Sequence, residues 1–209
     1  MKLLSTGLVF CAALTSLVAA CSDDEIDSDE AARRAYLGLD ASIGKSITLG
    51  FQGFNAASSA NIDPQMTTGT PPDGTGTLTI TGQVDQGSSA NKGMRLRVGM
   101  VDYSDGPFVI DDDGNTIVVT YDTATDVTAQ PYLSMMLKDI PTGTIEGALT
   151  GVYTLSGDDL SGEITLDLTF NGTMMGTSQQ DVARVPGSTT VTGTATNSDG
   201  GVYDVNVTL

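Results

Sequence analysis

Residue types that support catalysis are scarce in this sequence. It contains no histidine, and its two cysteines, Cys11 and Cys21, both lie within the first 21 residues. Ser-His-Asp and Cys-His catalysis would therefore lack a base, and zinc sites built on histidine or cysteine would lack ligands. We expect a non-enzymatic protein without a cofactor.

One tetrapeptide, Ser42-Ile43-Gly44-Lys45, has the Ser-x-x-Lys spacing of penicillin-binding proteins and β-lactamases. In that chemistry the serine opens a helix, so that the lysine lies one turn away and can take its proton. Here Lys45 leads into residues 46–49, which we interpret as a strand, and the companion S-D-N and K-T-G motifs are absent. We therefore interpret the match as a coincidence.

Three oxygen-bearing side chains at alternate positions, Asp111, Asp113 and Asn115, form a weak candidate for a calcium site. An EF-hand loop requires glycine at its sixth position and a bidentate glutamate at its twelfth. Here Gly114 is fourth and Asp122 is twelfth. We favour a charged hairpin tip, with calcium binding as the alternative.

Other charged residues offer two further kinds of site. Arg95 and Arg97 project from one face of one expected strand, where they can pair with acidic residues across the sheet or contact an anionic or polysaccharide partner. Glycoside hydrolysis needs paired carboxylates, and Glu146 and Glu163 are the glutamates within the expected domain. Glu163 alternates with core positions, so we expect it to face solvent.

The chain is strongly acidic, with 26 acidic and nine basic residues and a formal charge of −17. Such a surface repels nucleic-acid phosphates and anionic membranes. We therefore exclude nucleic acid as a partner, and any membrane attachment has to come from a lipid.

The first 20 residues have the layout of a signal peptide: Lys2, then an apolar run that is too short and too interrupted to span a membrane. The run ends in Val18-Ala19-Ala20-Cys21, which resembles the lipobox of bacterial lipoproteins. The resemblance implies cleavage before Cys21, diacylglycerol on its sulfur and usually a further acyl chain, such as palmitate, on its amine. Two or three chains anchor a protein stably, here in the outer membrane of the cell envelope, facing the periplasm or the surface.

An acidic segment follows the cysteine: six of the nine residues from Ser22 to Glu30 are acidic. Such a segment cannot collapse into a core. We predict that residues 21–35 form a solvated tether, with a short helical turn over Glu30–Tyr36 as the alternative. Residues 36–209 are predicted to form a single β domain.

Alternation of apolar and polar residues recurs from about residue 45 to the C-terminus, for example over residues 94–100, 163–170 and 203–209. This period of two is typical of antiparallel sheets packed on one face. Turn-forming residues separate the segments at Asp111–Asn115 and Ser198–Gly201. We predict an all-β antiparallel meander of about ten strands, forming a β-sandwich or closed β-barrel, with a long loop over Asn55–Thr75.

Three functions fit these expectations. The one we favour is a lipid-anchored envelope domain that acts as a non-enzymatic binding or scaffold module. The alternatives are a small β-barrel carrier of a hydrophobic ligand and a carboxylate-dependent glycan hydrolase. The expected partners are the membrane, through acyl chains on Cys21, and a protein, glycan or small hydrophobic ligand.

Overall fold

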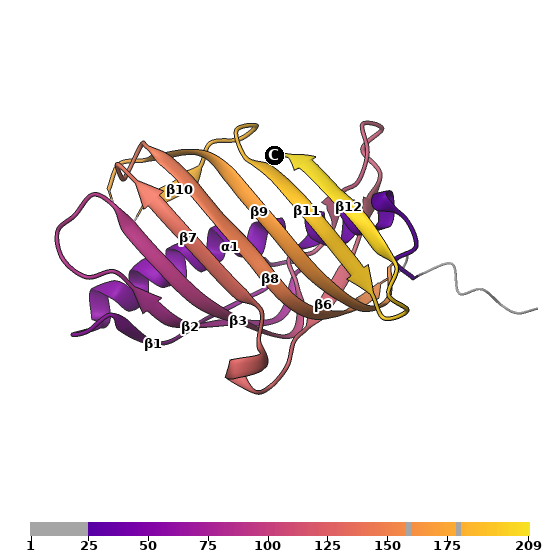
Figure 1. Cartoon of the computed structure of the whole chain (residues 1–209), viewed down its shortest axis with the longest axis horizontal. Helices are drawn as coiled ribbons and strands as arrows, with labels where there is room; N and C mark the ends of the chain where they lie inside the picture. Colours follow the sequence, from indigo (N-terminus) through magenta and orange to yellow (C-terminus); the bar gives the residue numbers. More distant parts are fainter. Residues whose placement is uncertain (1–24, 158–159, 179–180) are drawn as a thin grey trace, which may run out of the picture.

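The structure is a computed structural model that describes residues 25–157, 160–178 and 181–209. Within these ranges one α-helix precedes twelve strands (Figure 1). Ten strands form one large antiparallel sheet and two form a separate small hairpin. The prediction of an all-β antiparallel meander of about ten strands is confirmed.

Helix α1 (Asp29–Ala56) corrects the expectation of a strand after Lys45. Ser28 caps it, because its side chain accepts a hydrogen bond from the backbone N–H of Ala31 at 3.2 Å. Its buried positions recur at intervals of three and four residues, which places them on one face. These residues are Ala32, Ala35, Tyr36, Gly38, Leu39, Ser42, Ile43, Ser46, Ile47, Leu49, Gly50, Phe51 and Gly53. The helix is therefore stabilised by packing against the sheet.

The large sheet follows chain order in most places, with hydrogen-bonded neighbours β1-β2-β3-β6-β8-β9-β11-β12, while β7 pairs with β3 and β8 and β10 pairs with β9. Its strands are β1 (Asn61–Thr68), β2 (Thr75–Val84), β3 (Lys92–Ser104), β6 (Val119–Asp122), β7 (Tyr132–Lys138), β8 (Thr144–Gly157), β9 (Gly162–Gly176), β10 (Val182–Arg184), β11 (Thr190–Asn197) and β12 (Val202–Thr208). A 3-10 turn, η1 (Val127–Ala129), precedes β7. The predicted turn at Ser198–Gly201 joins β11 and β12.

The small hairpin consists of β4 (Phe108–Val109) and β5 (Thr116–Ile117), with the predicted Asp111–Asn115 turn between them. In the large sheet, cross-strand pairs such as Leu149 with Leu168 and Phe170 with Val191 place apolar side chains on one face. The intervening residues of β9 are exposed. The alternation read from the sequence therefore does separate a buried face from a wet one.

The large sheet curls around α1. The helix contacts β1, β2 and β3 near one end of the strand order and β10 and β12 near the other. Figure 1 shows α1 running behind β7, β8 and β9. Side chains of α1 such as Ile43, Ile47 and Phe51 belong to the same buried core as the inward side chains of the sheet. The helix therefore fills the concave face of the sheet.

Two segments differ from the sequence expectation. The predicted long loop Asn55–Thr75 contains the last two residues of α1, all of β1 and the first residue of β2. The predicted solvated tether is folded from Glu25 onward, since Ile26 is buried and its carbonyl accepts a hydrogen bond from Asn197 Nδ2 at 2.9 Å. Acidic residues do not prevent this, because one apolar anchor and the start of α1 hold the segment against the sheet. Across the described ranges, no helix has both the length and the apolar character needed to span a membrane.

Candidate functional site

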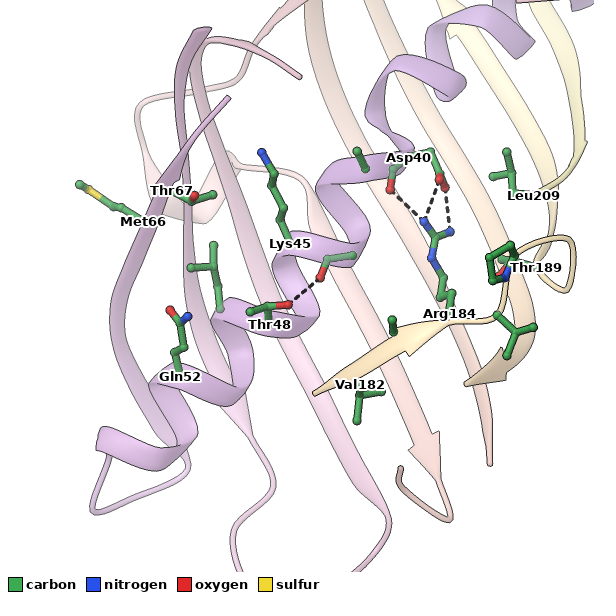
Figure 2. Close-up of a pocket in the computed structure, with 16 residues that line it drawn as sticks. Asp40, Lys45, Thr48, Gln52, Met66, Thr67, Val182, Arg184, Thr189 and Leu209 are labelled. Carbon is green, nitrogen blue, oxygen red and sulfur yellow. Dashed lines mark hydrogen bonds and ion pairs between the residues drawn. The ribbon is translucent and has the colours of Figure 1, made fainter. Parts of the chain in front are cut away.

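An open groove runs along the solvent side of α1, and we call it the α1 groove. Its floor is α1 from Asp40 to Gln52, and its walls are β1 at Met66 and Thr67 and the segment Val182–Pro186 at β10 (Figure 2). The groove has a volume of about 690 Å³. Small-molecule sites typically occupy roughly 300–1,000 Å³, so the α1 groove has the size of a ligand site.

An ion pair fastens the β10 wall to the floor. Arg184 donates from Nη1 to Asp40 Oδ1 and from Nη2 to Asp40 Oδ2, both at 2.7 Å, and Tyr36 Oη donates to Asp40 Oδ1 at 2.9 Å. The two charged side chains are only 13% and 21% exposed. Burial lowers the pKa of the Arg184 guanidinium, but the hydrogen bonds and charge of Asp40 outweigh it and raise that pKa overall. This bidentate pair sets the position of the β10 wall.

A second ion pair joins the floor to the loop beyond β3. Lys45 Nζ contacts Asp105 Oδ1 and donates to the carbonyl of Thr68 in β1 at 3.1 Å. Tyr103 Oη donates to Asp105 Oδ2 at 2.7 Å. Burial, and next the hydrogen bond to Asp105, raise the pKa of Tyr103 above its ordinary value. Lys45 is therefore held in a network, with its ammonium group 5.5 Å from the centre of the Tyr103 ring.

Gly44 lies on the groove floor, in the interior of α1, and a Cβ built on it would meet no atom within 4 Å. A glycine inside a helix costs about 1 kcal/mol relative to alanine. The neighbouring Thr48 hydroxyl donates to the Gly44 carbonyl at 3.3 Å (Figure 2). No described neighbour is therefore close enough to exclude a side chain at position 44.

The far end of the groove is formed by Thr189 and Leu209. Their backbones exchange hydrogen bonds, from Thr189 N to Leu209 O at 3.0 Å and from Leu209 N to Thr189 O at 2.8 Å. Among the described residues, the Thr189 hydroxyl is the buried side-chain polar atom that lacks a hydrogen-bond partner. An unpaired buried hydroxyl destabilises a fold.

The candidate calcium residues lie outside the α1 groove, at the tip of the small hairpin. The Asp111 carboxylate accepts hydrogen bonds from the backbone N–H of Asp113 at 3.1 Å and of Asn115 at 3.0 Å, and from Asn115 Nδ2 at 2.8 Å. The pKa of Asp111 is lowered, first by the Asn115 side chain. In the ranges that the structure describes, no three acidic, histidine or cysteine side chains converge on a metal position. Asp111 therefore shapes the turn.

The two arginines of β3 also lie outside the groove. Arg95 forms an ion pair with Asp85 at 2.7 Å, and its hydrogen bond is the main reason why the pKa of Asp85 is lowered. Arg97 donates to the carbonyl of Gln130 at 2.8 Å, and its guanidinium lies 4.9 Å from the centre of the Tyr132 ring. Arg95 thus has the carboxylate partner expected from the sequence, whereas Arg97 contacts a carbonyl and an aromatic ring.

The structure gives the serine, the lysine and the two glutamates singled out in the sequence no common site. Cys21 lies outside the described residues. Ser42 and Lys45 lie in the middle of α1, where the Ser42 hydroxyl donates to the Leu39 carbonyl at 2.6 Å and Lys45 pairs with Asp105. Ser42 therefore does not open a helix. Glu146 is exposed and pairs with Lys138 at 2.6 Å, and Glu163 is exposed on β9, so the structure does not bring these two together in the groove.

Sequence reasoning missed the groove because it missed the helix. Asp40, Gly44 and Lys45 lie on the polar side of α1, whose buried side repeats every three to four residues. That periodicity over residues 32–53 was the available signal. Comparisons of the chain with protein-family models, with curated proteins and with solved structures found no match.

Proposed function

We propose that the chain is a lipid-anchored, non-enzymatic binding module of the cell envelope that holds its ligand in the α1 groove. The observation that supports this proposal is the groove itself, about 690 Å³ in volume and bounded by α1, β1 and β10. A groove of this size between secondary-structure elements is typical of ligand sites.

The charges in the groove favour binding over catalysis. Asp40, Lys45 and Arg184 are the charged side chains among the described residues that line it, and each is held in an ion pair. Glycan hydrolysis requires two carboxylates that face each other across a cleft. Of the described lining residues Asp40 alone supplies a carboxylate side chain, and Arg184 holds both of its oxygens.

A carrier of a hydrophobic ligand is the second candidate. The concave face of the sheet, where a carrier barrel would keep its cavity, is occupied by side chains of α1 such as Ile47 and Phe51. A hydrophobic ligand would therefore use the α1 groove as well, and the two candidates share one binding site.

A dye-binding experiment tests the site. The neutral dye N-phenyl-1-naphthylamine fluoresces when it enters an apolar pocket, and we expect saturable fluorescence with the wild-type protein. Thr48→Trp places a large ring on the groove floor, while Asn55→Trp places the same ring on an exposed part of α1 outside the groove. We expect Thr48→Trp to abolish the signal and Asn55→Trp to keep it. Equal binding by both variants would exclude the α1 groove as the site.

The anchor is tested separately, in cells. The proposal of an anchor comes from the resemblance of Val18-Ala19-Ala20-Cys21 to a lipobox. We expect the wild-type protein to incorporate labelled palmitate and to sediment with membranes, and Cys21→Ser to do neither. If the wild-type protein incorporated no labelled palmitate, the lipid anchor would be excluded from the proposal, while the proposal of a binding site in the α1 groove would still stand.

A further inference from the structure

Gly44 differs from the other glycines of α1. A Cβ at Gly50 would lie 2.9 Å from the sulfur of Met94, and a Cβ at Gly53 would lie 2.8 Å from Cβ of Ile62. Gly38 is blocked in the same way by Tyr121 and Phe108. These three glycines let α1 approach the sheet, whereas Gly44 faces open space on the groove floor.

A helix glycine that close packing does not require leaves room for a ligand to approach the backbone closely. Figure 2 shows Lys45 on the side of β1 and the Asp40–Arg184 pair on the side of β10. Gly44 directly precedes Lys45 on α1 and lies one turn after Asp40, so it lies on the floor between these two contacts. A ligand that crosses the floor at Gly44 can touch both walls at once, because no side chain stands between them at that position.

The lining of the groove indicates the class of ligand. Aliphatic side chains line it from every element: Leu49, Met66, Val182, Val185 and Leu209. Of the described residues that line it, none is aromatic. The groove therefore offers contacts to a flexible hydrocarbon chain but no ring on which a sugar or a planar group could stack.

The charges of the groove and of the whole chain narrow the class of ligand further. The charged side chains of the groove already have partners within the protein, so a charged headgroup would gain little from them. The net charge of −17 also repels anions at a distance. It attracts cations, but of the described lining residues Asp40 alone supplies a carboxylate side chain, and Arg184 already holds both of its oxygens. We propose that the ligand of the α1 groove is an uncharged single-chain amphiphile whose aliphatic chain crosses α1 over Gly44. This inference rests on the proposed function and specifies its ligand class.

The test uses Gly44→Leu and a set of probes with the same twelve-carbon chain. Leucine is a far better helix former than glycine and has open space here, so we expect the urea midpoint of the variant to equal or exceed that of the wild type. The probes are dodecyl maltoside, laurate, dodecyltrimethylammonium and maltose alone, titrated by calorimetry below their micelle concentrations.

We expect dodecyl maltoside to bind the wild type, laurate and dodecyltrimethylammonium to bind more weakly, and maltose alone not to bind. Each buried methylene contributes about a factor of four in affinity, so a leucine that displaces two of them weakens binding about tenfold or more. Asn55→Ala, which also raises helix propensity but lies outside the groove, should bind as the wild type does.

The outcomes separate this inference from the proposed function. Loss of binding together with retained or increased stability in Gly44→Leu supports a chain over Gly44. Equal affinity in the variant and the wild type, tighter binding of laurate or dodecyltrimethylammonium, or binding of maltose alone would overturn the inference. If dodecyl maltoside does not bind but the naphthylamine dye binds and Thr48→Trp abolishes its binding, only the inferred ligand class is overturned. If the dye does not bind either, the proposed binding site is overturned as well.

Discussion

Of the glycines of α1, Gly38 is the one whose added Cβ would meet a neighbouring atom at the shortest distance, and it therefore gives a strict test of how the helix packs. A Cβ at Gly38 would lie well inside van der Waals contact of Tyr121 Oη and 2.8 Å from Phe108 Cε1. Tyr121 is fully buried, and its hydroxyl donates to the carbonyl of Ala35 at 2.9 Å. Neither the ring nor the hydroxyl can move away freely.

We expect Gly38→Ala to lower the free energy of unfolding by about 2 kcal/mol. Overpacking of a tight core costs up to about 3 kcal/mol, and the change from glycine to alanine in a helix returns about 1 kcal/mol. Tyr121→Phe should cost about 1 kcal/mol through its lost hydrogen bond. In the double variant the missing hydroxyl leaves room for the new methyl group, so the combined loss should fall at least about 1 kcal/mol short of the sum.

Urea unfolding of the four proteins, followed by circular dichroism, measures this coupling energy. Tyr153→Phe is the matched control, because this equally buried ring packs edge-to-face on Tyr121, with 6.4 Å between the ring centres. Its combination with Gly38→Ala should be additive within about 0.5 kcal/mol. Additivity for Tyr121→Phe as well would refute the seating of α1 against β6 described above.

Three further predictions concern the ion pair, the unpaired hydroxyl and the tyrosines. Asp40→Ala leaves Arg184 partly buried without its partner, so we expect the free energy of unfolding in urea to fall by about 2 kcal/mol. Breaking a fully buried ion pair costs more, about 3–5 kcal/mol. An unchanged urea midpoint would show that the pair does not hold β10. Thr189→Val removes a buried hydroxyl that lacks a hydrogen-bond partner and should raise the free energy of unfolding by about 1 kcal/mol. A lower free energy of unfolding would mean that the hydroxyl has a hydrogen-bond partner in solution. Stability should be constant between about pH 6 and 9, because the chain has no histidine. Burial raises the folded-state pKa of four tyrosines, Tyr36, Tyr103, Tyr121 and Tyr153. Above about pH 10 only the unfolded chain therefore releases these protons, and the free energy of unfolding should fall by roughly 5 kcal/mol per pH unit. A flat unfolding profile up to pH 11 would contradict the burial of these rings.

The sheet was predictable because its signal is local. A strand buried on one face repeats every two residues, and β9 shows this directly, with Ile164, Leu166, Leu168 and Phe170 buried and the residues between them exposed. Turn residues mark the strand ends in the same local way, as at Ser198–Gly201. Fold class and approximate strand number therefore follow from short stretches of sequence.

The helix was not predictable with the same ease, because local preference opposes it. Residues 29–56 include four glycines and several β-branched residues, which lower helix propensity. Burial decides the conformation instead, since 13 residues of α1 lie in the core and three of the glycines let it approach the sheet. An apolar period of three to four residues is present over residues 32–53, but it overlaps the start of the period of two near residue 45, so the local pattern alone does not separate helix from strand there.

The sequence by itself determined the chemistry that is absent and the character of the surface: no histidine, a net charge of −17 and an alternating β pattern. Only the tertiary structure decided where a ligand could bind. Asp40 and Arg184 are 144 residues apart in the chain, and they meet because the sheet curls far enough to bring β10 beside α1. Such a contact depends on the packing of a shared core, which no local pattern encodes.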